Sequence, residues 1–157
     1  MVFLENWYTP LLLAHLFVTF VLVGAMTHQL LVFPRYARGQ FGKAKQEHRY
    51  LKVGFWSYVI VYVVGSIIYP AFRVHIRGAL FDGSLPWATG LFEVKEHWGA
   101  VGLAFFVVCM VLRRGFEPKE DSRPLYLYVP LMVLLNVIVW YKVVVGCYLS
   151  LLKGSFS

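Results

Sequence analysis

Four long apolar stretches take up most of this chain, and each is long enough to cross a lipid bilayer. They run near residues 10–33, 53–72, 91–112 and 125–152. A helix of about 20 residues, rising ~1.5 Å per residue, spans the ~30 Å hydrocarbon layer of a bilayer. We therefore predict an all-α fold, a polytopic membrane four-helix bundle that forms a single domain over residues 1–157.

The composition argues against a water-soluble fold and against nucleic acid as a partner. Hydrophobic residues make up 59% of the chain, whereas soluble domains have about 45–50%. The net charge is +7, but the basic residues gather beside the apolar stretches, where lipid headgroups supply the anions. Cys109 and Cys147 have no metal-type spacing, so we expect two small buried apolar side chains. The expected partners are membrane lipids and other membrane subunits.

The distribution of basic residues predicts the orientation of the chain. Ten flank the first and third connections between stretches: Arg35, Arg38, Lys43, Lys45, Arg49, Lys52, Arg113, Arg114, Lys119 and Arg123. Four lie on the other side: Arg73, Arg77, Lys95 and Lys153. Because cytoplasmic loops carry the excess of Lys and Arg, we predict an integral membrane protein of the bacterial inner membrane with both termini outside. The long first stretch, preceded by Glu5, argues against a cleaved signal peptide.

Two histidines indicate a cofactor site. His15 lies about two turns into the first stretch, and His97 lies at a similar distance into the third. Imidazoles from different helices at comparable depth are the arrangement that bis-histidine haem ligation needs in a bundle. Arg73, Lys95 or Lys142 would then neutralise the haem propionates. An equally good alternative is that each imidazole only hydrogen-bonds to a neighbouring helix.

The other histidines are expected to have structural or solvated positions. His15 and His28 point about 140° apart on a helix, so they cannot both face one bundle axis, and a second haem is not expected. We expect His28 at a polar cytoplasmic end of the first helix, His48 in a solvated loop and His75 at the membrane interface.

Lys142 stands inside the fourth apolar stretch. An amine there costs at least ~2.5 kcal/mol on insertion scales, so it needs a partner or water. The simplest partner is Glu93 or Glu96, which should lie on the same side of the membrane. A propionate clamp, a proton relay or snorkelling to the headgroups are the alternatives. Asn136, on the same helix, is expected to bond across to a neighbour.

Glu93 and His97 share a helix face at i,i+4 spacing. A carboxylate in this position can orient a ligating imidazole, although acidic residues are also ordinary at helix starts. A non-haem metal site formed by Glu93, His97 and His15 is a further alternative, without the tight spacing that metal sites usually have.

Four short motifs resemble a group of small four-helix membrane proteins. They are His15 in LLAHLF, Arg35 in FPRY, Tyr50 in HRYLKV and Lys95 in FEVK. The group includes the haem-binding protoporphyrinogen oxidases and the copper-resistance D-type proteins. The resemblance implies a haem-associated membrane role over most of the chain and names no substrate. This chain departs from the group's pattern at Glu93, where the third helix usually has a histidine two residues before the lysine.

The sequence leads to three hypotheses of function and names no catalytic residue. The first is a b-type haem protein with His15 and His97 as ligands, which serves electron transfer as a subunit of a larger membrane complex, such as an oxidoreductase. The second is a cofactor-free accessory or scaffold subunit of a respiratory or photosynthetic complex. The third is a proton or ion pathway that uses Lys142, Glu93 and Glu96.

Overall fold

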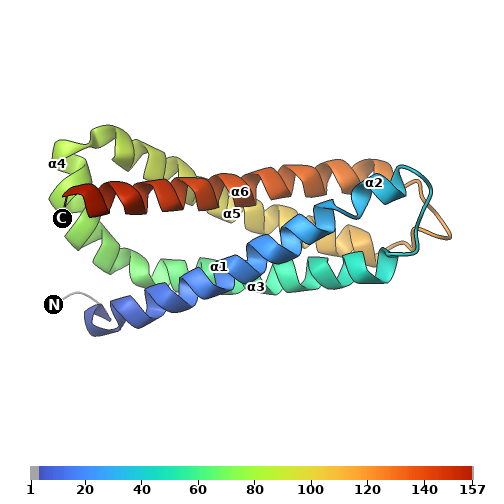
Figure 1. Ribbon diagram of the computed structural model, residues 1–157, viewed down its shortest axis with the longest axis horizontal. Helices are drawn as coiled ribbons and strands as arrows, with labels where there is room; N and C mark the ends of the chain where they lie inside the picture. Colours follow the sequence, from blue (N-terminus) through green and yellow to red (C-terminus); the bar gives the residue numbers. More distant parts are fainter. Residues whose placement is uncertain (1–3, 157) are drawn as a thin grey trace.

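The computed structural model describes residues 4–156, which form a bundle of four long helices (Figure 1). These helices are α1 (Tyr8–Leu30), α3 (Ala44–Phe72), α5 (Pro86–Arg114) and α6 (Leu125–Phe156). The shorter elements are η1 (Glu5–Trp7), α2 (Phe33–Tyr36), η2 (Arg73–Phe81), which is a π-helix, and α4 (Asp82–Ser84). The described residues contain four helices long and apolar enough to cross a membrane. The predicted all-α class and the four predicted helices are confirmed.

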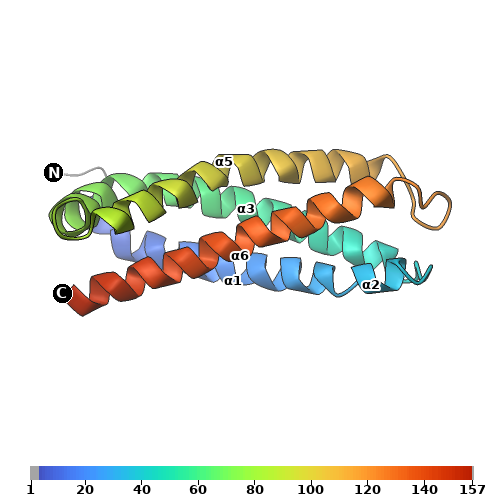
Figure 2. The same ribbon diagram turned by 90° about the horizontal axis from the view of Figure 1, so that it is seen from above.

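The two ends of the bundle differ. Both termini lie at one end together with η2 and α4, whereas α2 and the connection between α5 and α6 lie at the other (Figures 1 and 2). We call these the termini end and the α2 end. The first and third connections, which carry most of the basic residues, therefore meet at the α2 end.

The four helices pack in a ring. α1 packs along α3 and α5 packs along α6, while contacts of α3 with α5 and of α1 with α6 complete the ring. As a result α1 and α5 lie diagonally across the bundle. Large apolar side chains cover the outside of the helices, among them Phe17, Phe20, Trp56 and Val111. Such an apolar exterior is what a helix bundle needs when hydrocarbon is its solvent.

The apolar interior is divided into two clusters. The larger one lies toward the α2 end and includes the fully buried Met26, Leu51 and Phe106. The smaller one lies at the termini end, where the ring of Phe72 stacks on that of Phe92 with 4.6 Å between centroids. Between Phe92 and Phe106 along α5, the interior is polar, and this layer contains the candidate site.

Candidate functional site

Ionisable side chains from three helices meet in the polar layer. They are His15 of α1, Lys95 and Glu96 of α5, and Lys142 of α6, and we call them the His15 cluster. Glu96 stands at the edge of this layer, because its side chain is 47% exposed. The charges of Lys95, Lys142 and Glu96 all lie close enough to His15 to act on its imidazole. Glycines on neighbouring helices make the space for three of these side chains.

The His15 ring lies against α3 at Gly65. Its Cε1 atom is 3.3 Å from the point where a Cβ on Gly65 would stand. The Nδ1 atom of His15 is buried and has no hydrogen-bond partner among the described residues. Because an unpaired buried polar atom costs about 1–3 kcal/mol, this nitrogen is a candidate for binding something that the protein itself does not supply.

The Lys142 side chain crosses from α6 to α5. Its amine nitrogen is 2.8 Å from the Cβ position of Gly99 and 5.3 Å from the centroid of the Tyr58 ring. Among the described residues, no carboxylate lies within ion-pair distance of this amine. The expected pair with Glu93 or Glu96 does not form, because each of these glutamates has another partner.

Those partners are basic residues nearer the termini end. Glu93 accepts from the Arg77 guanidinium at 2.6 Å, and Glu96 accepts from the Lys95 amine at 2.9 Å. The Lys95 stem passes 3.6 Å from the Cβ position of Gly146 on α6, and its amine lies 4.9 Å from the Phe92 ring centroid. Lys95 on α5 therefore reaches toward α6, and Lys142 on α6 reaches toward α5.

His97 and Arg73 do not join the cluster. His97 is exposed, and its Nδ1 atom contacts the carbonyl of Glu93 on its own helix at 2.7 Å. Gly99, two residues further on, faces Lys142, and two residues on an α-helix point about 200° apart. Arg73 is exposed on η2. The structure thus brings together three of the five predicted site residues, His15, Lys95 and Lys142, and shows no contact between His15 and His97.

Two related expectations also differ from the structure. The imidazole of His97 contacts the backbone carbonyl of Glu93, while the Glu93 carboxylate is taken up by Arg77. Within the described part of the chain, no three His, Cys, Asp or Glu side chains gather in a way that could hold a metal ion. The arrangement therefore does not fit a metal held by Glu93, His97 and His15.

The residues that carry the resemblance divide between the two ends of the bundle. His15 and Lys95 belong to the His15 cluster, whereas Arg35 and Tyr50 line a cavity near the α2 end. Glu93 stands where the resembled group usually has a histidine. Comparisons of the chain with protein-family models, with curated proteins and with solved structures gave no match.

The chemistry of the His15 cluster follows from its charges. Lys95 pairs with the exposed Glu96 carboxylate, which leaves the Lys142 amine and the His15 imidazole without an acidic partner among the described residues. Charge inside a helix bundle is expensive unless it is paired. The cluster can therefore accept an anionic group, or it can exchange protons through the imidazole and the amines.

Sequence reasoning missed a second polar centre, which lies inside the bundle near the α2 end. The Glu47 carboxylate is fully buried and accepts from Arg113 at 2.8 Å and from Gln29 at 2.7 Å. The hydroxyl of Tyr128 also donates to Glu47, and that of Tyr36 lies 3.4 Å away. This Glu47 network links α1, α2, α3, α5 and α6.

The guanidinium of Arg113 is equally well satisfied. Besides Glu47 it donates to the carbonyls of Phe116 at 2.9 Å and Ala44 at 3.3 Å. A buried charge pair that is fully hydrogen-bonded holds its helices in one register, and breaking one partner is costly. We interpret the Glu47 network as structural, because its two charged groups, Glu47 and Arg113, already pair with each other.

A signal for this network is present in the sequence. Glu47 stands on the same helix face as Leu51, Gly54 and Tyr58, which follow at spacings of four, three and four residues and are all buried. That spacing places the carboxylate on the inner stripe of the helix.

Other expected positions are corrected as well. Cys109 is buried as expected, but Cys147 is exposed on the outside of α6. Asn136 bonds to the carbonyl of Met132 on its own helix at 2.9 Å instead of to a neighbouring helix. His48 is half-buried within α3 rather than in a loop.

Proposed function

We propose that this chain is an integral membrane protein whose His15 cluster binds the anionic group of a lipophilic ligand. In this proposal the α2 end is cytoplasmic, because it carries the excess of basic residues. The observation that carries the proposal is the unpaired Lys142 amine in the middle of the bundle, beside a buried His15 nitrogen that has no partner.

Charge balance selects an anionic group. Inserting an amine into a membrane helix costs at least ~2.5 kcal/mol, so an intramembrane lysine without a carboxylate indicates a partner that is not part of the chain. Lys95 reaches from α5 toward Gly146 of α6, and Lys142 reaches from α6 toward Gly99 of α5. A carboxylate between these helices would accept a hydrogen bond from the Lys142 amine and could share the Lys95 amine with Glu96. Charge-assisted bonds of this kind are about twice as strong as neutral ones.

Haem is the ligand of this class that the resemblance implies. The donor set at Lys95 and Lys142 fits haem propionates, and His15 is the histidine of the same cluster. The pairing of His15 with His97 does not fit, so the proposal takes His15 as the only histidine ligand. When bound, haem would supply one-electron transfer, which agrees with a role as a subunit of a larger redox complex.

A haem titration tests this proposal. Purified protein in detergent is titrated with hemin, and oxidised and reduced optical spectra are recorded. We expect a Soret band whose position changes in His15→Ala, and an affinity at least about tenfold lower in Lys142→Met, since a hydrogen bond to a charged group contributes ~1.5–3 kcal/mol. His97→Ala is the matched control, because His97 is exposed and should leave both unchanged.

The outcomes separate the hypotheses. An effect of His97→Ala equal to that of His15→Ala would restore the two-histidine site. No Soret band at any hemin concentration would remove haem from the proposal, and a cofactor-free accessory subunit would then be the better description.

Proton transfer is a second candidate, and the free Nδ1 atom of His15 favours it. An imidazole and two amines beside one carboxylate are groups that relay protons in membrane proteins. Protein reconstituted into vesicles with a pH gradient tests this function. Lys142→Met should abolish proton flux, with His97→Ala again as control; flux that persists in Lys142→Met would exclude the relay.

A further inference from the structure

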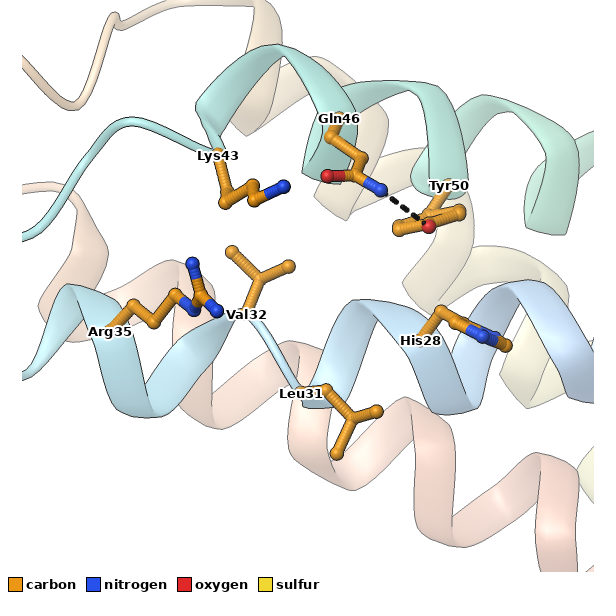
Figure 3. Close-up of a pocket in the computed structure, with 7 residues that line it drawn as sticks. All are labelled: His28, Leu31, Val32, Arg35, Lys43, Gln46 and Tyr50. Carbon is orange, nitrogen blue, oxygen red and sulfur yellow. Dashed lines mark hydrogen bonds between the residues drawn. The ribbon is translucent and has the colours of Figure 1, made fainter.

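A cavity near the α2 end is lined by cationic groups and lies apart from the His15 cluster. It has a volume of about 180 Å³ and is formed by seven residues of α1, α2 and α3 and of the links between them. Its polar lining includes Arg35 and Lys43, whose side chains reach into the gap between the helices from opposite sides (Figure 3). We call it the Arg35 cavity.

The two cations of this cavity are not neutralised by the protein. Neither Arg35 nor Lys43 forms an ion pair or a side-chain hydrogen bond with another described residue, and no Asp or Glu lines the cavity. The nearest acid in the sequence, Glu47, is turned inward and is occupied by Arg113. An anion in the cavity would therefore meet two positive charges and no competing carboxylate.

A hydroxyl group adds a directional donor. The side-chain amide of Gln46 donates to the Tyr50 oxygen at 2.7 Å, which fixes the phenol and leaves its own hydrogen free to be donated (Figure 3). The Tyr50 ring lies beside the His28 ring, with 5.6 Å between centroids. Arginine, lysine and a hydroxyl together form the kind of donor set that binds the several oxygens of a phosphate.

We propose that the Arg35 cavity binds a phosphate group, and that the headgroup of an anionic membrane lipid supplies it. The cavity lies at the end of the bundle where the basic residues gather, which the orientation proposal places at the cytoplasmic leaflet. Leu31 and Val32 complete the lining and would contact the glycerol and upper acyl chain. The volume, several times the ~30 Å³ of one water molecule, leaves room for phosphate oxygens with bridging water. This inference does not depend on what the His15 cluster binds.

Lipid titration with a charge-matched control tests the site. Purified protein in detergent is titrated with phosphatidylglycerol, with phosphatidylcholine or with inorganic phosphate, and bound species are counted by native mass spectrometry. Arg35→Gln/Lys43→Gln removes both cavity cations. Arg38→Gln/Lys45→Gln removes the same charge from two residues that are exposed, as Arg35 and Lys43 are, but that do not line the cavity.

We expect phosphatidylglycerol to bind in preference to phosphatidylcholine, whose choline would bring a cation against Arg35 and Lys43. Binding should weaken at least about tenfold in the cavity variant and less than about threefold in the control variant. Tyr50→Phe, which keeps all charges, should weaken binding about threefold.

Equal losses in the two double variants would reduce the effect to general surface charge and overturn the proposal. If inorganic phosphate binds and its binding weakens in the cavity variant, while phosphatidylglycerol does not bind, a lipid is not the source of the phosphate group.

Discussion

The amine of Lys142 on α6 lies 2.8 Å from the point where a Cβ on Gly99 of α5 would stand. Any residue larger than glycine at position 99 would put its Cβ atom against the amine and displace it. Gly99 has a second contact, because its carbonyl oxygen accepts a hydrogen bond from the Tyr58 hydroxyl of α3 at 2.9 Å. Gly99 is therefore the point at which α3, α5 and α6 fix the polar layer between the two apolar clusters.

Gly99→Ala should displace the Lys142 amine without unfolding the protein. The overlapping atom is the far end of a flexible side chain, so the amine moves, and overpacking of this kind costs about 1–3 kcal/mol. Affinity for hemin should fall, as in Lys142→Met. Gly90→Ala on the same helix is the control, since its Cβ meets nothing within 4 Å and should stabilise the helix by roughly 0.5–1 kcal/mol. Thermal unfolding and hemin titration measure both effects; an unchanged hemin affinity in Gly99→Ala would contradict this placement of Lys142.

Gly102 and Tyr58 should be energetically coupled. A Cβ on Gly102 would overlap the Tyr58 hydroxyl, so Gly102→Ala should cost about 1–3 kcal/mol of stability. Tyr58→Phe alone should cost about 0.5–1.5 kcal/mol, because it removes the hydrogen bond to Gly99. In the Tyr58→Phe background part of the overlap disappears, so the double variant should be more stable than the sum of the single costs by at least ~0.5 kcal/mol. Simple additivity in this double-mutant cycle would argue against the contact.

Glu47→Gln should be strongly destabilising. The amide nitrogen that replaces one carboxylate oxygen turns its donors toward Gln29 and Tyr128 or toward Arg113, depending on which oxygen it replaces. In either case it leaves the buried guanidinium without its counter-charge. Breaking one partner of a buried ion pair costs about 3–5 kcal/mol. Denaturant unfolding in detergent measures the loss, with Glu117→Gln in the exposed connection after α5 as control. Earlier thiol labelling of the buried Cys109 should accompany unfolding, and a loss below about 1 kcal/mol would show that Glu47 is not a structural centre.

The proposed orientation can be checked with single cysteines in a variant that lacks Cys109 and Cys147. Gly83→Cys introduces a thiol at the termini end, where a Cβ meets nothing within 4 Å. Lys119→Cys introduces one in the exposed connection at the α2 end. A membrane-impermeant maleimide added to intact cells should label position 83 and not position 119. The reverse labelling pattern would mean that the α2 end faces outside and that the Arg35 cavity lies at the outer leaflet.

Sequence patterns predicted the helices better than the contacts between them. Each apolar stretch became a helix. The sequence also assigned His15 and Lys95 to one site, and the structure places their side chains near each other. His97 was expected in the same site because its depth matched that of His15. Depth follows from counting along a helix, but the direction of a side chain follows from how the helix is rotated, and His97 is exposed.

Glu47 shows the opposite error. No role was predicted for Glu47, although its spacing to Leu51 and Gly54 marks the buried stripe of α3. Its partners Arg113 and Tyr128 lie 66 and 81 residues away in the chain. No local pattern indicates which distant donor will complete a buried acid.

The sequence by itself determined that this chain forms four apolar helices and that its basic residues are concentrated in the first and third connections. These properties depend only on residue type and on distance along the chain. Residue type sets the cost of transfer to hydrocarbon, and the number of residues sets the length of the helix. The tertiary structure alone decided that Lys142 meets Gly99, that Glu47 meets Arg113, and that His97 points away from His15. Such contacts depend on which helices are neighbours and on how each helix is rotated about its axis. A glycine such as Gly99 can be recognised as space for a lysine only when the neighbouring helix that carries the lysine is known.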